Sequence, residues 1–120
     1  MLRWVSPVIY FRRTATQDTE IRGQKIEKGQ KVAMWYGAAN RDEEIFEESQ
    51  KFLVDRKNAN KHLAFGAGQH LCLGNQLGKM QIRVLFEELL KAYPSMHSVS
   101  EPVRVSSNFL DAVSDLQVTS

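Results

Sequence analysis

The residues best able to do chemistry lie together between Phe65 and Leu77, where a glycine-bearing loop delivers the only cysteine, Cys72, to the start of a long helix. At a helix N-terminus, the free backbone N–H groups and the helix dipole favour the thiolate, which is the form of cysteine that binds metals. Few side chains surround the sulfur, because glycine occupies three nearby positions: Gly66, Gly68 and Gly74. Gly78 follows one turn beyond Gly74 on the same helix face, so a broad, flat group has room to approach the backbone.

Other kinds of site compete with a metal-binding thiolate. Most lone cysteines are buried small hydrophobes, and a glycine loop before a helix can also bind phosphate. The chain contains neither a GxGxxG nor a GxxxxGK(S/T) pattern, and its three histidines and one cysteine lack the spacing of a zinc site. What remains is a single soft ligand, which suits haem iron held by a cysteine thiolate better than a site with several protein ligands.

The elements that must position this loop read as short strands and one long helix. β-Branched and aromatic residues predict strands over Val8–Ala15 and Lys31–Tyr36, and Glu20–Gly29 predicts a tight strand–turn–strand with glycine at two turn positions. Apolar residues recur at helical spacing over Asn75–Tyr93, and Pro94 ends that helix. The tail, Val103–Val118, predicts further short strands.

The stretch from Gly37 to Lys61 has no sustained strand alternation. It leaves room for a short helix around Ala38–Arg41 or Glu43–Phe46, and its large apolar anchors are Phe46, Phe52 and Leu53. A structureless loop longer than about 15 residues indicates either a function or a missing partner.

Composition sets limits on the class of protein. The chain has 120 residues, of which 42% are hydrophobic and 25% charged, with a net charge of +2. So small a charge, without any Lys/Arg block, indicates no nucleic-acid or membrane partner. No apolar run approaches the roughly 18 residues of a membrane span, and the N-terminus does not read as a signal peptide. One cysteine cannot form an internal disulfide, so a reducing compartment is expected.

The run from Phe65 resembles the haem loop of the cytochrome P450 family, F-x-x-G-x-(R/H)-x-C-x-G, at Phe65, Gly68, His70, Cys72 and Gly74. This resemblance implies an α+β chain, the C-terminal portion of the mainly-α cytochrome P450 fold. Residues 1–120 would form a single portion of one domain, with the N-terminal portion absent. The cofactor implied is haem b (iron protoporphyrin IX), with the Cys72 thiolate as the iron ligand.

The same resemblance assigns roles within the loop. The backbone N–H groups of Leu73, Gly74 and Asn75 would donate hydrogen bonds to the sulfur, and Phe65 would shield it and help to set the redox potential. His70 would meet a haem propionate. The cofactor-binding residues implied in this segment are therefore Phe65, Gly66, His70, Cys72, Leu73, Gly74 and Gly78. Gly78 stands where the family usually has alanine.

The resemblance extends over essentially the whole chain. Arg13 stands where the family places a propionate-binding arginine, with Arg12 as the fallback, and a guanidinium pairs with a carboxylate through two hydrogen bonds. The segment Ala39-Asn40-Arg41-Asp42 resembles the family's meander, in which Arg41 and Arg56 would be structural ion-pair partners. Substrate-lining positions fall near the two ends of the chain, over Val8–Phe11 (Ile9 and Tyr10 above all) and at Phe109 and Leu110, where simple strand packing is an equal alternative.

The activity implied is that of a haem-thiolate monooxygenase, which hydroxylates an apolar substrate with one oxygen atom of O2. Electrons from NAD(P)H would arrive through a ferredoxin or a flavin reductase, docked on basic residues that include Arg56, Lys57, Lys61 and Lys79. The sequence resembles those of soluble bacterial cytochromes P450, some of which act on steroids or branched lipids. A cytoplasmic location is therefore expected.

Arg3 matches the arginine of the family's E-x-x-R pair, whose glutamate would fall one position before Met1. We therefore expect Met1 to be an internal methionine of a longer protein, whose missing part carries the oxygen-activating helix. The alternative function is a non-catalytic haem-binding fragment or an unstable truncated one. In either case the apolar face of the Asn75–Tyr93 helix would lose its covering and promote association.

Overall fold

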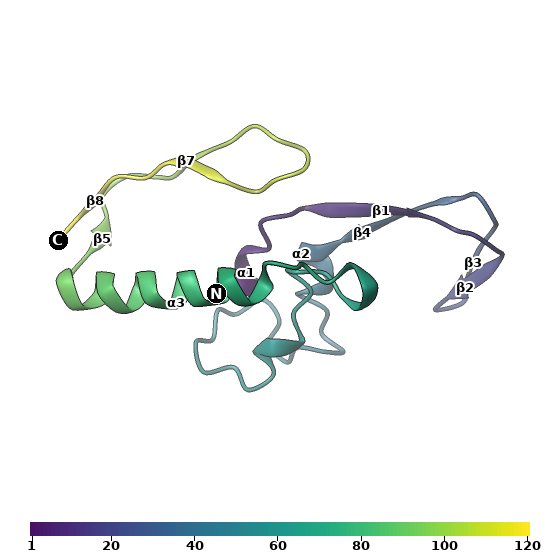
Figure 1. The fold of residues 1–120 in the computed structure, drawn as a ribbon, viewed down its shortest axis with the longest axis horizontal. Helices are drawn as coiled ribbons and strands as arrows, with labels where there is room; N and C mark the ends of the chain where they lie inside the picture. Colours follow the sequence, from purple (N-terminus) through teal and green to yellow (C-terminus); the bar gives the residue numbers. More distant parts are fainter. The chain divides into compact units, whose positions relative to one another are not determined.

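The computed structural model describes residues 1–120 and divides into two compact units. Unit 1 is Met1–Ala64 together with Asn108–Leu110, and unit 2 is Phe65–Ser107 together with Asp111–Ser120. Short antiparallel strand pairs and a few helices make up both units, so the expected α+β class is confirmed (Figure 1). None of the helices is long and apolar enough to cross a membrane.

An arm of paired strands dominates unit 1 (Figure 1). Strand β1 (Tyr10–Thr14) pairs antiparallel with β4 (Lys31–Trp35), and β2 (Thr19–Ile21) pairs antiparallel with β3 (Gln24–Ile26). The predicted strand–turn–strand is therefore confirmed. Its two turn residues, Arg22 and Gly23, have φ of +48° and +80°, as a type I′ hairpin turn requires.

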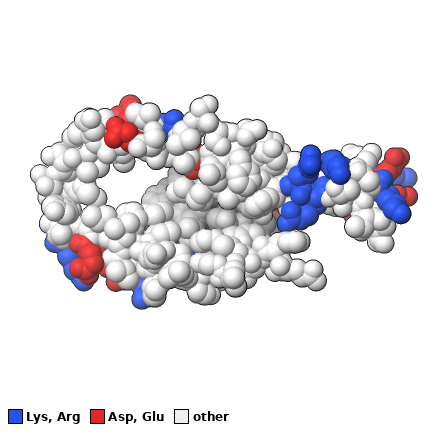
Figure 2. Space-filling model, turned by 45° about the horizontal axis from the view of Figure 1, so that its top comes forward, with Lys and Arg blue, Asp and Glu red and all other residues white.

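The tip of the arm carries charges of both signs. Figure 2 shows basic and acidic side chains next to each other at its right-hand end, where Figure 1 places β2 and β3. Arg22 extends from the hairpin turn and forms ion pairs with Asp42 at 3.4 Å and with Glu44 at 2.8 Å. These exposed contacts connect the tip of the arm with residues 37–61 of the same unit, which we call the irregular segment.

The irregular segment of unit 1 is packed, although it has little regular structure. The helices of unit 1 are α1 (Leu2–Val5), α2 (Tyr36–Ala39) and the 3-10 turn η1 (Ala59–Lys61). Phe46 is 1% exposed and confirms the expected anchor, whereas Phe52 and Leu53 are 49% and 37% exposed and do not act as anchors. Phe52 instead rests edge-on against Trp4, with ring centroids 5.8 Å apart.

Arg3 holds this segment together from α1. One of its guanidinium nitrogens donates to the carbonyls of Asn40 at 2.6 Å and Ser49 at 3.0 Å, and the other donates to the carbonyl of Lys51 at 3.0 Å. The side chain is only 5% exposed. Burial lowers the pKa of the Arg3 guanidinium, and the nearby cations of Arg56 and Arg41 lower it further.

The expected ion pairs of Arg41 and Arg56 are absent. Arg41 donates to the carbonyls of Gly37 and Trp4, and Arg56 donates to three carbonyls between residues 47 and 51. Neither guanidinium has a carboxylate within 4.0 Å. In a segment without a strand ladder, peptide carbonyls need donors, and arginine offers five N–H groups in a fixed fork.

Unit 2 begins with the cysteine loop and continues into helix α3 (Asn75–Ala92), which ends one residue before the predicted terminus at Tyr93. The tail folds into two antiparallel pairs. Strand β5 (His97–Ser98) pairs with β8 (Val118–Thr119), and β6 (Val103–Arg104) pairs with β7 (Val113–Asp115). The predicted short strands of the tail are confirmed, while β5 lies outside the range that the sequence indicated.

Helix α3 has no buried residue. Leu77, Met80 and Val84 are 55%, 52% and 48% exposed, and their spacing places them on one stripe of the helix. This exposed apolar stripe agrees with the expectation that the face of the helix lacks a covering.

Candidate functional site

The cysteine loop of unit 2 is closed by a backbone hydrogen bond. The N–H of Cys72 donates to the carbonyl of Phe65 at 2.8 Å, so the intervening residues form a compact loop. Within it Gly66 and Gly68 have φ of +73° and +61°, which residues with a Cβ adopt only with strain. Glycine is therefore needed at both positions for the backbone path itself. Gly68–His70 then form the 3-10 turn η2, which leads directly to Cys72.

The thiol of Cys72 is exposed and forms no disulfide. The N–H groups of the next two residues, Leu73 and Gly74, make no hydrogen bond to another residue. The sequence predicts Asn75 as a third donor to the sulfur, and this is wrong in detail. The backbone N–H and the side-chain amide of Asn75 donate to the Cys72 carbonyl instead, at 3.2 and 2.8 Å. Asn75 is the first residue of α3, so its N–H has no acceptor within the helix and bonds to a carbonyl that precedes the helix.

Phe65 packs on the first turns of α3. A Cβ built on Gly78 would lie 3.5 Å from Cζ and 3.7 Å from Cε1 of the Phe65 ring. The ammonium of Lys79 lies 5.8 Å from the centroid of the same ring. Phe65 is half-buried, and its expected place beside the ligand loop agrees with the structure.

The surroundings of Cys72 fit a haem. No cluster of three or more His, Cys, Asp or Glu side chains exists, so a metal here must bring its other ligands with it. Three apolar side chains of the loop and of the first turn of α3 are exposed, with Leu71 at 53%, Leu73 at 101% and Leu77 at 55%. A Cβ on Gly74 would lie 3.9 Å from the sulfur, so glycine leaves that flank open. One soft donor, an apolar rim and an open flank suit a flat macrocycle that carries iron.

His70 and Arg13, the two expected propionate partners, belong to different units. His70 ends η2 with an exposed imidazole in unit 2. Arg13 lies on β1 in unit 1, where it donates to the Arg12 carbonyl at 3.0 Å and lies 5.8 Å from the centroid of the Phe11 ring. It has no carboxylate within 4.0 Å, so its charge is available to an anionic ligand.

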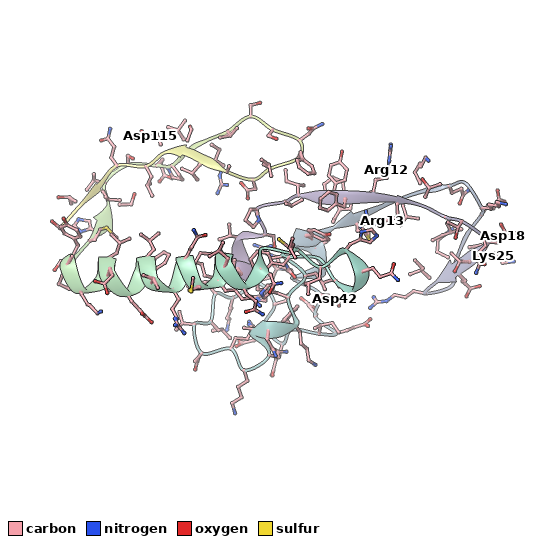
Figure 3. The ribbon with its side chains drawn as sticks, viewed as in Figure 1. Arg12, Arg13, Asp18, Lys25, Asp42 and Asp115 are labelled. Atoms are coloured by element: carbon pink, nitrogen blue, oxygen red, sulfur yellow. The ribbon has the colours of Figure 1, made fainter.

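Strand alternation separates Arg13 from its predicted fallback. Figure 3 shows Arg12 and Arg13 pointing to opposite sides of β1. Tyr10 shares the face of Arg12 and packs against Trp35, with ring centroids 5.1 Å apart. Phe11 shares the face of Arg13. One carboxylate-bearing group therefore cannot use both arginines from the same side.

The structure brings together three of the four expected substrate residues. The N–H of Ile9 donates to the carbonyl of Phe109 at 2.9 Å, and Val8 forms a β-bridge with Leu110. Tyr10 lies on the other face of the strand. Phe11 also lies in the stretch Val8–Phe11 that the resemblance placed at the substrate pocket, and its ring meets Phe109 edge-on, with centroids 5.6 Å apart. Strand alternation places Phe11 on the same face as Arg13.

The expected basic docking residues differ in what they contact. Lys57 and Lys61 are exposed in unit 1. The guanidinium of Arg56 donates to backbone carbonyls and is only half-exposed. The ammonium of Lys79, in unit 2, lies over the Phe65 ring.

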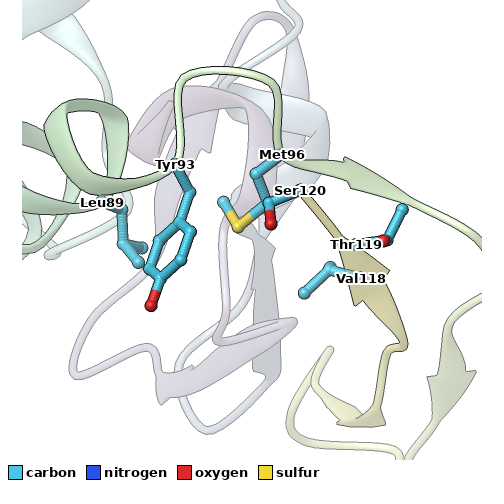
Figure 4. Close-up of a pocket in the computed structure, with 6 residues that line it drawn as sticks. All are labelled: Leu89, Tyr93, Met96, Val118, Thr119 and Ser120. Carbon is cyan, nitrogen blue, oxygen red and sulfur yellow. The ribbon is translucent and has the colours of Figure 1, made fainter.

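An open hollow of about 420 Å³ lies at the other end of α3, lined by Leu89, Tyr93, Met96 and the C-terminal residues (Figure 4). It is remote from Cys72 along the helix and does not belong to the cysteine site.

Comparison with known proteins agrees with this architecture. Residues 1–111 match the family model described as Cytochrome P450. The methyl-branched lipid omega-hydroxylase of Mycobacterium tuberculosis (strain ATCC 25618 / H37Rv) is 47% identical over 120 residues, which is 99% of this chain and 28% of that protein. Linalool 8-monooxygenase of Pseudomonas putida is 46% identical over 118 residues, covering 98% of this chain and 29% of that protein.

Solved structures of cytochromes P450 are also similar to this chain. Cytochrome P450-153 from Novosphingobium aromaticivorans superposes with a TM-score of 0.88 at 44% identity, covering 98% of this chain and 30% of that one. A cysteine loop, a long helix and a strand arm thus recur in one known architecture. The chain belongs to the cytochrome P450 family, and it spans 28% of the length of the first curated relative. At the level of the family, the relatives named here are a hydroxylase and a monooxygenase.

Proposed function

We propose that this chain supplies the cysteine side of a haem site in a monooxygenase, with Cys72 as the iron ligand. The observation that carries the proposal is the exposed thiol at the start of α3, next to two unused N–H groups and an apolar rim. When bound, the haem supplies activation of O2, from which one oxygen atom is inserted into a C–H bond of the substrate.

The residues of the chain would bind and orient that group. The N–H groups of Leu73 and Gly74 donate to the sulfur and stabilise its negative charge. Gly66, Gly74 and the other loop glycines leave room for a flat ligand, and the ring of Phe65 excludes water from one side of the thiolate. The imidazole of His70 and the guanidinium of Arg13 would bind the haem propionates.

The partners follow from the same proposal. Electrons originate from NAD(P)H and arrive through a ferredoxin or a flavin reductase, for which Lys57 and Lys61 offer exposed charge. The substrate is apolar: the names of the relatives include a methyl-branched lipid and linalool, and a further relative is named Steroid C26-monooxygenase. Ile9, Phe11 and Phe109 contribute the apolar contacts to it. The bacterial origin of these relatives supports a cytoplasmic location.

The two units are proposed to be parts of one domain. The chain supports this, since it leaves unit 1 after Ala64 and returns to it at Asn108–Leu110. A second candidate, haem binding without turnover, requires only the Cys72 loop and the exposed apolar side chains beside it.

The experiment is to reconstitute the protein with haem, reduce it with dithionite under CO and record the difference spectrum. We expect a thiolate-type Soret band that disappears in Cys72→Ser. His70→Gln serves as the matched control, because it changes a propionate contact and leaves the sulfur in place. A band that survives in Cys72→Ser contradicts the proposal. Turnover of an apolar substrate with a reductase then separates the enzyme from the haem-binding candidate.

A further inference from the structure

Lys79 has an unusual place among the basic residues of α3. Arg83 and Lys91 are each within 4.0 Å of a glutamate on the same helix, Glu87 and Glu88 respectively. Lys79 has no such carboxylate, and its ammonium lies 5.8 Å from the centroid of the Phe65 ring. A cation over an aromatic face is attracted by the negative charge of the π-electrons.

The Phe65 ring also lies against α3 at Gly78. Its Cζ and Cε1 atoms are 3.5 and 3.7 Å from where a Cβ of Gly78 would be. Glycine there gives the ring no side chain to rest against, so its position depends more on the remaining contacts. Lys79 is one of them.

Phe65 in turn contacts the candidate iron ligand through its backbone. Its carbonyl accepts the hydrogen bond from the N–H of Cys72 at 2.8 Å. Lys79 is therefore connected to Cys72 through a single residue, with all three groups in unit 2.

We propose that Lys79 is a positioning residue of the Cys72 site: its ammonium holds the Phe65 ring over Gly78 and places a positive charge beside the thiolate. This inference rests on the proposed function. Reduction of the iron site by one electron adds negative charge, and a nearby cation stabilises that charge, so Lys79 favours the reduced state. A ring fixed in place also keeps water from the sulfur.

The test is the midpoint potential of the haem-loaded protein, measured with dithionite as the electron source and no protein donor. Lys79→Gln is expected to lower the potential relative to the wild type, and Lys79→Arg to restore it. Lys91→Gln, which removes an equal charge from the far end of the same helix, is expected to leave the potential unchanged. Equal shifts in Lys79→Gln and Lys91→Gln would overturn the proposal, as would no shift in either.

A double-mutant cycle with Phe65→Leu tests the role of the ring. The shift caused by Lys79→Gln is expected to shrink in the Phe65→Leu background, since the ammonium then has no ring to hold. An undiminished shift shows that Lys79 acts without Phe65 and contradicts its positioning role. Failure of the proposed function would look different, because the wild type itself would lack the thiolate-type CO band.

Discussion

Three glycines near Cys72 have different reasons to be glycine. Gly66 and Gly68 adopt positive φ, so the path of the loop depends on them. Gly78 lies inside α3, where any residue fits the backbone, and a methyl group there would touch only the Phe65 ring at ordinary contact distance. At the residue scale, two of these positions are therefore fixed by conformation, and the third is open to change.

Gly78→Ala is expected to raise the free energy of unfolding by about 1 kcal/mol, because alanine is the better helix former by that amount. Contact of the new methyl with Phe65 adds to the gain. Gly68→Ala is the matched comparison: its Cβ meets nothing within 4 Å, so the roughly 1–2 kcal/mol loss expected there comes from the positive φ alone. Urea denaturation followed by circular dichroism measures both. A destabilised Gly78→Ala would show that the ring has no space to accept the methyl.

How far the site could be predicted depends on the range of the contacts. The motif around Cys72 is local, so its loop, its glycines and the helix that follows were all predictable from spacing. The hydrogen bond from Asn75 to the Cys72 carbonyl was not, since a motif names residues without saying which backbone atom each one meets. The contact of Lys79 with Phe65 depends on two side-chain rotamers, which sequence spacing does not specify.

At the scale of elements, the irregular segment is organised by side chains that replace a strand ladder. Asn40 is fully buried at the end of α2, where its amide donates to the Ser6 hydroxyl at 2.7 Å. Its side-chain oxygen accepts the N–H of Leu63 at 2.6 Å, and its backbone carbonyl accepts Arg3. This one residue links α1, α2 and the approach to the cysteine loop.

Asn40→Ala is expected to cost about 2 kcal/mol or more, because a buried N–H and a buried hydroxyl each lose a partner. Asn60→Ala, in the exposed turn η1, is expected to change stability by less than about 0.5 kcal/mol. Thermal or urea unfolding of the two variants checks the difference. Similar stabilities would mean that water satisfies the groups that Asn40 now meets.

The turn at Glu48 makes a prediction about pH. A side-chain hydrogen bond and the charge of Lys51 lower the pKa of the Glu48 carboxyl. The contribution of this pair to stability is therefore present above the unfolded pKa of about 4.3 and is lost as the pH falls through the lower folded value. Lys51→Gln is expected to return the pKa of Glu48 toward that ordinary value, which a carboxyl NMR titration measures. An unchanged midpoint in Lys51→Gln would rule out Lys51 as the cause.

Regular elements were predictable where a period was sustained, and the irregular segment was not. The apolar period of α3 gave its start and placed its end within one residue, and β-branched and aromatic residues gave β1 and β4. By contrast, Arg3 reaches carbonyls 37 to 48 residues away, a range over which no local pattern exists. The expected ion pairs of Arg41 and Arg56 were wrong for the same reason, since the demand for donors comes from folded backbone.

At the scale of the whole molecule, the apolar surface of α3 has consequences for how the chain behaves in solution. Leu77, Met80 and Val84 follow one another at helical spacing, and each is about half exposed or more. Other large hydrophobic residues of the helix, such as Leu85 and Leu90, are also more than half exposed. Contiguous apolar surface of this kind drives association, whereas single exposed apolar residues do not.

We therefore expect the chain by itself to associate as its concentration rises, which sedimentation velocity over a dilution series would show. Replacing Leu77, Met80 and Val84 together by glutamine is expected to shift the distribution towards monomer, because it removes the contiguous stripe while keeping good helix formers in α3. Leu90→Gln is the control: at 100° per residue it lies about 120° around the helix from Val84, outside the stripe. If the triple variant associates as strongly as the wild type, or if Leu90→Gln has the same effect, the stripe is not the contact surface. Circular dichroism of each variant establishes that α3 is still formed when the distributions are compared.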